Sequence, residues 1–246
     1  MGSNRVLNVA HRGASALAPE NTLAAFELAL ELGADGIELD TMLSADGELV
    51  VIHDHTVDRT TDGSGPVRHK SLTELQSLDA GSKFSPRFRG ERIPMLRQVF
   101  DLVGRRGLID VEISTRSPRG DGLEEKLVGL IRASGLQETV VVTSFNPFAL
   151  WRMRRLAPEI RLGIIFAEDL PMVLRDRWLA FLSRPDLLVP RRTMVTAEFV
   201  SRAVKDGQQV WVWTDHDDTE MARLVDMGAH AIITDRPDEL SRVLGR

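Results

Sequence analysis

Hydrophobic and polar positions along the chain follow two alternating patterns. Short runs rich in Val, Ile and Leu recur from one end of the sequence to the other, and most are separated by longer segments with helical periodicity. This alternation is typical of βα units around a parallel sheet. Nine runs are predicted to be strands: VLNVA (6–10), GIELD (36–40), ELVVIH (48–53), LIDVEI (108–113), TVVVTSF (139–145), RLGIIF (161–166), DLLVP (186–190), VWVWT (210–214) and AIITD (231–235).

The segment NTLAAFELALELG, which follows the first predicted strand, illustrates the helical pattern. Leu23, Phe26 and Leu30 fall on one face of a helix that can cover the sheet. We expect Asn21 to cap the start of this helix with its side chain, and Gly33 to end it.

One connection departs from the βα alternation. Only TMLSADG (41–47) separates the second and third predicted strands, which is too short for a parallel crossover, and SADG is typical of a turn. We therefore expect a hairpin there. Eight parallel strands and one antiparallel companion favour an α/β fold of the TIM type, a (β/α)8 barrel, which typically needs about 250 residues. An open doubly wound sheet is the alternative, but VAHRGASA is not its Gly-rich nucleotide fingerprint.

A polar segment interrupts the pattern after the third strand candidate. Residues 54–93 are rich in Gly, Pro and Arg and show little periodicity apart from SLTELQSL. We interpret this segment as an insertion beside a strand end, where barrels carry their specificity loops. No linker or internal repeat divides the chain, so residues 1–246 are predicted to form a single domain.

Composition excludes several classes of protein. The chain has 246 residues, a formal net charge of -5 and a pI near 5.7, which argue against a generic nucleic-acid surface. It contains no cysteine, so disulfides and thiolate chemistry are excluded. The N-terminal sequence lacks a signal-peptide core and no run is long enough to span a membrane, so we expect a cytoplasmic protein without stable membrane insertion. The oligomeric state is left open.

Three carboxylates are predicted to meet at one edge of the barrel. Glu38 and Asp40 alternate with apolar residues in GIELD and therefore share a face of their strand. Glu112 occupies the matching position of the strand 108–113, in register with Asp110. Neighbouring carboxylates repel one another unless a cation lies between them, and an all-oxygen set suits Mg²⁺ or Ca²⁺. The alternative is a surface edge strand with solvated acidic residues.

Two histidines and an arginine fall beside these acids. His11 ends the first predicted strand and His53 ends the third, so a barrel would bring both to the acidic edge. Two imidazoles can act as general base and general acid near neutral pH. Arg12 offers a planar cationic group suited to a phosphate. A cation, an arginine and an acid-base pair together indicate hydrolysis of a phosphate ester.

The sequence resembles the glycerophosphodiester phosphodiesterases, relatives of the phosphatidylinositol-specific phospholipases C with a TIM-barrel fold. The resemblance covers nearly the whole chain and is densest over residues 11–65, from HRGASALAPENT through GIELD to IHDHTVDRTTDGSG; it resumes at IPMLRQVF, VEI, TSFNP, VWVWT and AIITDRPDEL. It implies hydrolysis of a glycerophosphodiester to an alcohol and sn-glycerol 3-phosphate. The roles that it implies are acid-base catalysis by His11 and His53, metal binding by Glu38, Asp40 and Glu112, and substrate binding by Arg12, Glu20 and Trp213.

Two positions depart from the pattern of the family. Ser114 stands where many members carry Lys, and Asp215-His216 follows Trp213-Thr214 where many have Asn. Two other functions therefore stay open. One is a lysophospholipase D, which an apolar groove near Trp178 and Phe181 would favour, although we expect those side chains to pack on the barrel. The other is a catalytically silent barrel that binds phosphodiesters.

Overall fold

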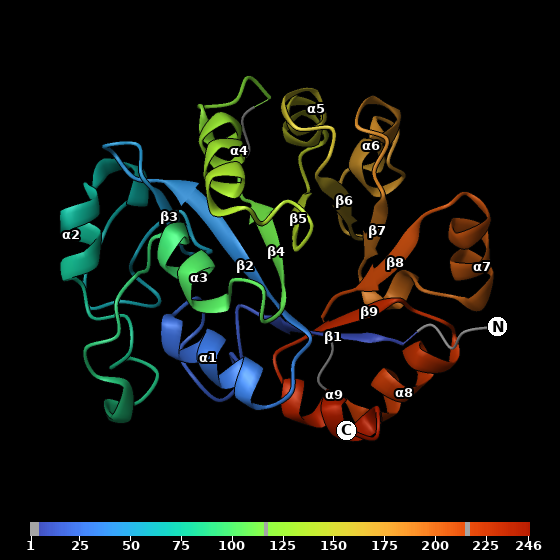
Figure 1. Ribbon diagram of the computed structural model, residues 1–246, viewed down its shortest axis with the longest axis horizontal. Helices are drawn as coiled ribbons and strands as arrows, with labels where there is room; N and C mark the ends of the chain where they lie inside the picture. Colours follow the sequence, from blue (N-terminus) through green and yellow to red (C-terminus); the bar gives the residue numbers. More distant parts are fainter. Residues whose placement is uncertain (1–4, 116–117, 215–216) are drawn as a thin grey trace.

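Nine strands form one closed sheet in the computed structural model, which describes residues 5–115, 118–214 and 217–246 (Figure 1). The order is β1-β9-β8-β7-β6-β5-β4-β2-β3, and β1 also pairs with β2, which closes the barrel. Every pairing is parallel except that between β2 and β3. The strands are β1 (Leu7–His11), β2 (Gly36–Leu43), β3 (Leu49–Val51), β4 (Leu108–Ile113), β5 (Val140–Ser144), β6 (Arg161–Phe166), β7 (Leu187–Pro190), β8 (Gln209–Val212) and β9 (Ala231–Thr234).

These strands confirm the predicted TIM-type barrel and its additional hairpin. β3 runs antiparallel to the end of β2, with Thr41 opposite Val51 and Leu43 opposite Leu49. All nine predicted runs contain a strand, with bounds that differ from the sequence prediction by a few residues. The open doubly wound alternative is wrong, because β1 is bonded on both sides, to β2 and to β9.

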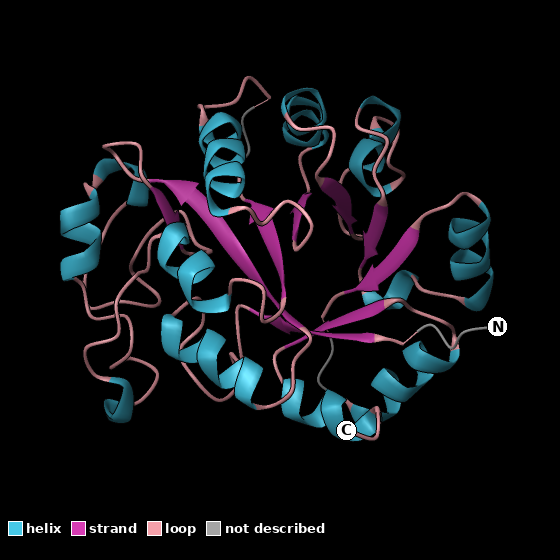
Figure 2. Cartoon of the chain, in the orientation of Figure 1, coloured by secondary structure: helices cyan, strands magenta, loops and turns pink. Residues whose placement is uncertain are grey.

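Helices surround the barrel on its outside, as Figure 2 shows. Within the described residues, none of them combines the length and the hydropathy that crossing a bilayer requires. The α-helices are α1 (Leu23–Glu31), α2 (Leu72–Ser77), α3 (Leu96–Val103), α4 (Leu123–Ser134), α5 (Pro147–Leu156), α6 (Met172–Arg175), α7 (Ala197–Lys205), α8 (Asp218–Asp226) and α9 (Pro237–Val243). Short 3-10 helices are η1 (Val67–His69), η2 (Pro86–Phe88), η3 (Ala180–Leu182) and η4 (Arg192–Met194).

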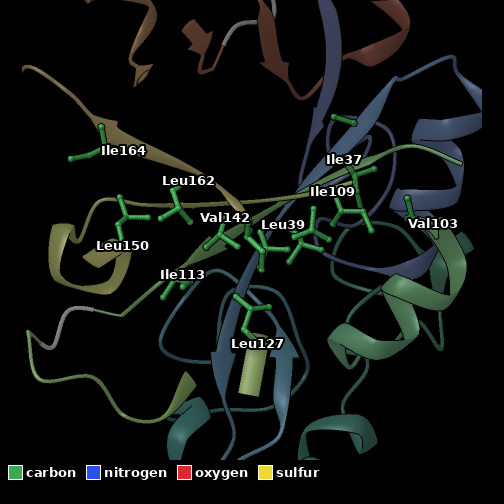
Figure 3. Packing of buried hydrophobic residues seen from close by; sticks show 14 of the residues in the cluster. Ile37, Leu39, Val103, Ile109, Ile113, Leu127, Val142, Leu150, Leu162 and Ile164 are labelled. Carbon is green, nitrogen blue, oxygen red and sulfur yellow. The ribbon is translucent and has the colours of Figure 1, made fainter. Parts of the chain in front are cut away.

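The alternation of side chains along the strands creates two apolar clusters. Outward residues such as Ile37 and Leu39 of β2 pack under the helices; Figure 3 shows Ile37 beside Ile109, and Leu39 between Ile109 and Leu127 of α4. Inward residues of β1 and of β5 through β9 fill the interior of the barrel. The inward positions of β2 and β4 carry carboxylates instead. The barrel interior is therefore acidic beside β2 and β4 and apolar beside the other strands.

The predicted cap of the first helix is wrong by one residue. Thr22, not Asn21, is the N-cap of α1, and its hydroxyl accepts a hydrogen bond from the amide of Ala25. Asn21 has a φ of +57° and turns its side chain inward, where its Nδ2 donates to Asp40 Oδ2 at 2.9 Å. Gly33 follows the end of α1 with a φ of +84°, as the sequence predicts.

The insertion after β3 packs on the β2–β3 hairpin. A small cluster joins Met42 and Val50 of the hairpin to Val57, Val67 and other buried residues of the segment 54–93. Its helix α2 begins with a capping box, in which Ser71 and Glu74 exchange hydrogen bonds with each other's amides. The apolar cluster holds the insertion against the hairpin, beside the carboxyl end of β2.

The segment that follows β6 corrects another expectation. Trp178 and Phe181 do not pack on the barrel, because they are 55% and 69% exposed. Helix α6 ends at Arg175, so Trp178 lies beyond it and Phe181 lies in the three-residue helix η3, and neither side chain is on a helix face long enough to cover the barrel.

Gly13, in the loop after β1, lies in close contact with the backbone of α1. It has a φ of +81°, and an added Cβ would lie 2.6 Å from the carbonyl carbon of Ala25 in α1. Gly13→Ala should therefore lower the free energy of unfolding by about 1 to 3 kcal/mol, measured by urea denaturation. Gly129→Ala is the control, since nothing surrounds that position in α4 and alanine favours helix. Equal stability of Gly13→Ala and wild type would contradict this close approach.

Candidate active site

The register of β2 and β4 brings four carboxyl groups together inside the barrel. Glu38 lies opposite Asp110, and Asp40 lies opposite Glu112. One oxygen from each of Glu38, Asp40 and Glu112 lies within 4.8 Å of the other two. The predicted grouping of these three acids is confirmed, and the solvated edge strand is wrong, because Glu38 and Asp40 are 4% and 1% exposed.

Burial of these acids opposes their ionisation. Loss of water contacts and repulsion by Asp40 raise the pKa of both Glu38 and Glu112 well above the ordinary value. Burial also raises the pKa of Asp110 to about 7, although Thr143 donates a hydrogen bond to it at 2.8 Å. Asp110 Oδ2 is buried, and within the described chain it has no hydrogen-bond partner. This all-oxygen donor set fits a hard divalent cation, which would offset the crowded negative charge.

Arg12 is the cation that the chain itself places against the acids. Its Nε lies 3.3 Å from Asp40 Oδ2, its Nη1 donates to Glu20 at 2.9 Å, and its amide donates to Glu38 at 3.0 Å. Burial opposes the charge of the guanidinium, but Asp40, Glu38 and Glu20 together raise the pKa of Arg12 above its ordinary value. Arg12 has a φ of +55°, which turns the chain sharply at the end of β1.

His11 lies between a bracing carboxylate and the acidic cluster. Its Nδ1 is 2.5 Å from Asp235 Oδ1, and its Nε2 is 3.9 Å from Glu38 Oε2. Ser15 also donates to Asp235 Oδ1, at 3.0 Å. Asp235 is not among the residues predicted from the sequence, although a carboxylate at the end of the strand run AIITD is a usable signal. The contact holds the ring by Nδ1 and leaves Nε2 toward the cluster.

His53 lies near the same acidic cluster, although it follows β3, which is not one of the eight parallel strands of the barrel. The strand β3 ends at Val51, so His53 lies two residues beyond the end of that strand. Because the hairpin returns the chain toward the barrel, the amide of Ile52 donates to the carbonyl of Asp40 at 3.0 Å. The Nδ1 of His53 lies 2.6 Å from Asp54 Oδ1, and the side chain is 41% exposed.

A cavity of about 200 Å³ joins these groups. Its apolar wall includes Trp213, whose ring meets Phe145 edge to face at 5.6 Å and whose Nε1 donates to the carbonyl of Val189 at 3.0 Å. The polar residues that line the cavity are His11, Arg12, Glu38, His53, Asp110, Glu112 and Thr143. A larger cavity, of about 510 Å³, lies between the α6 region and α7 and contains none of these polar groups.

Two other predicted positions lie elsewhere. Glu20 is absent from the lining of the 200 Å³ cavity, and arginines hold both of its carboxylate oxygens. Ser114 lines a neighbouring cavity of about 450 Å³, and its Oγ is buried. Asp215 and His216 lie outside the described residues.

The closed barrel with an acidic centre and two histidines defines the class of protein as a TIM-barrel enzyme. Residues 11–239 match the glycerophosphoryl diester phosphodiesterase family. A glycerophosphodiester phosphodiesterase from Caldanaerobacter subterraneus subsp. tengcongensis is 42% identical over 96% of both chains. A solved phosphodiesterase from Oleispira antarctica, in complex with the product sn-glycerol-3-phosphate, is 32% identical with a TM-score of 0.86 and covers 97% of this chain and 96% of its own.

A solved glycerophosphodiester phosphodiesterase from Agrobacterium tumefaciens agrees with these relatives. It is 32% identical, covers 96% of this chain and 99% of its own, and has a TM-score of 0.84. The chain therefore belongs to the glycerophosphoryl diester phosphodiesterase family and is an enzyme of that family.

Charge at the acidic cluster predicts how Glu38→Gln changes stability. Because the pKa of Glu38 is raised, metal-free protein loses stability as the pH rises through that raised pKa. In EDTA, Glu38→Gln should melt above wild type by a margin that grows as the pH rises, since wild type then gains a repelling charge that the variant lacks. Added Mg²⁺ or Ca²⁺ should stabilise wild type by ligand binding and the variant much less, in a calorimetric melt.

The control for this measurement is Glu125→Gln, which changes an exposed acid of α4. It should respond to the metal as wild type does. An equal gain of melting temperature with metal in Glu38→Gln and wild type would remove Glu38 from the proposed ligands.

Proposed function

We propose that the protein hydrolyses glycerophosphodiesters to an alcohol and sn-glycerol 3-phosphate, in a reaction that depends on Mg²⁺ or Ca²⁺. The observation that carries this proposal is one small cavity with an acidic cluster on one side and two braced histidines beside it. The product held by the Oleispira antarctica relative supports the assignment of sn-glycerol 3-phosphate. The packing of the insertion on the hairpin supports a single domain over residues 1–246.

The proposed roles follow from the chemistry of each side chain. A cation held by Glu38, Asp40 and Glu112 would supply positive charge to the phosphate oxygens. Arg12 lies beside that cluster and is suited to bind the phosphate through its guanidinium. The apolar wall around Trp213 excludes water from one side of the cavity.

His11 and His53 are proposed to move the protons. One accepts a proton from the attacking oxygen, and the other protonates the alkoxide that leaves when its bond to phosphorus breaks. Each imidazole is braced at Nδ1 by a carboxylate, Asp235 for His11 and Asp54 for His53. The bracing leaves Nε2 of each ring for the proton transfer.

Glycerophosphodiesters fit this cavity better than lysophospholipids. The lysophospholipase D alternative requires an apolar groove near Trp178 and Phe181 that leads to the catalytic groups. Neither aromatic residue lines the 200 Å³ cavity. A silent binding barrel is disfavoured because the complete set of acidic and imidazole groups lies together.

Release of sn-glycerol 3-phosphate from glycerophosphocholine tests the proposed reaction. The product should appear with Mg²⁺ or Ca²⁺ and disappear with EDTA, because the acidic cluster needs a cation to act on a phosphate. A coupled glycerol-3-phosphate dehydrogenase measures the rate. No product under any metal condition, with a well-folded protein, would refute the proposal.

Substitution of either histidine tests the acid-base assignment. His11→Ala and His53→Ala should each lower kcat by about 10²- to 10⁴-fold, the usual contribution of a general acid or base. His69→Ala, on the exposed end of η1, is the matched control and should keep wild-type kcat. Wild-type turnover in either of the first two variants would exclude that histidine from proton transfer.

A further inference from the structure

Five charged or ionisable side chains form a continuous row from Arg12 to His53. Arg12 donates to Glu20 at 2.9 Å, and Glu20 accepts two hydrogen bonds from Arg59 at 2.6 and 2.8 Å. Arg59 also donates to Asp54 at 2.6 Å, and Asp54 holds Nδ1 of His53 at 2.6 Å. Positive and negative groups alternate along this row, so each group stabilises the charge of its neighbours.

Arg59 is the centre of the row. Its Nη1 and Nη2 bind both oxygens of Glu20, and its Nε binds Asp54. A planar guanidinium can serve two carboxylates in this fixed geometry, whereas a lysine ammonium cannot. Glu20 lies in the loop after β1 and Arg59 lies in the insertion, so this one side chain joins the two segments over the site.

Both carboxylates of the row are ionised near neutral pH. The hydrogen bond from Arg59 lowers the pKa of Asp54 to about 2. Burial opposes the charge of Glu20, but Arg59 and Arg12 lower its pKa below the ordinary value. The pKa of Arg59 is raised by its bonds to Glu20 and Asp54. The row therefore keeps its charges over the pH range in which a histidine can transfer a proton.

We propose, resting on the function proposed above, that Arg59 is a positioning residue that orients His53 through Asp54 and Arg12 through Glu20. His53 follows the short strand β3 and lies outside any strand, so the contact with Asp54 orients its ring. Arg59 fixes Asp54 from the other side. The same guanidinium fixes Glu20, which holds Nη1 of Arg12 beside the acidic cluster.

If Arg59 only stabilised the fold, its loss would lower the melting temperature; if it positions His53 and Arg12, its loss should change kcat and KM instead. Arg59 is 49% exposed, and exposed ion pairs usually contribute little to stability. Loss of Arg59 should therefore leave the melting temperature nearly unchanged. Loss of the orientation of His53 and Arg12 should instead lower kcat and raise KM together, because the two arms act on proton transfer and on phosphate binding.

The experiment compares Arg59→Gln, Arg59→Lys and Arg92→Gln. The last variant is the matched control, since Arg92 belongs to the same insertion and donates to the carbonyl of Ser77. Arg59→Gln should lower kcat/KM by about 10- to 100-fold, the usual effect of losing a partner that orients a reacting side chain. Arg59→Lys should restore only part of this loss, and Arg92→Gln should match wild type.

Combining Arg59→Gln with Asp54→Asn tests whether Arg59 affects kcat through Asp54. If Arg59 acts on His53 through Asp54, Arg59→Gln should lower kcat no further in an Asp54→Asn background. Fold-changes in kcat that multiply would overturn this route. Wild-type kcat/KM in Arg59→Gln, or full activity in Arg59→Lys, would overturn the positioning role itself.

A measurement without turnover separates this proposal from the proposed function. Nitrogen-15 NMR of histidine-labelled protein reports the tautomer of His53, which His53→Ala identifies in the spectrum. Wild type should favour the Nδ1-protonated form, and Arg59→Gln should shift toward a mixture of tautomers while Arg92→Gln does not. An unchanged tautomer in Arg59→Gln would overturn the proposal, whereas absence of product from wild type would refute only the reaction.

Discussion

Burial of several carboxyl groups inside one barrel is the constraint to which the rest of the site responds. Glu38, Asp40, Asp110 and Glu112 project from two adjacent strands into the same interior. Charges of one sign at this depth would destabilise the fold without compensation. Arg12 supplies part of that compensation from the end of β1, and the proposed cation supplies the rest. The crowded negative charge is therefore also what would hold the proposed cation.

The barrel separates the acidic side formed by β2 and β4 from an apolar side formed by the other strands. Inward residues of the strands β5 through β9 fill the interior with Val, Ile, Leu and Trp side chains. Water is thereby excluded from one wall of the cavity, where Trp213 and Phe145 meet edge to face. Electrostatic interactions strengthen in such surroundings, so a few polar groups can act strongly on one phosphate.

Carboxylates outside the acidic cluster organise the two histidines. Asp235 comes from the end of the last barrel strand and braces His11, whereas Asp54 begins the insertion and braces His53. The contact between Asp235 and His11 joins the last strand of the barrel, β9, to the first, β1. The second depends on the hairpin that returns the chain toward Asp40. The fold thus gives two imidazoles from separate segments the same kind of carboxylate contact at Nδ1.

The sequence alone predicts the barrel, its hairpin and the acidic cluster, because strand alternation is local and fixes which side chains share a face. It did not determine which helix cap is used: Thr22 and Asn21 are both good caps, and only the buried Asp40 draws Asn21 inward. The contacts of Asp235 and Arg59 were likewise decided by the tertiary structure. His11 lies 224 residues from Asp235 and Glu20 lies 39 residues from Arg59, and no local pattern encodes the distance between two side chains that closure of the barrel or packing of the insertion brings together.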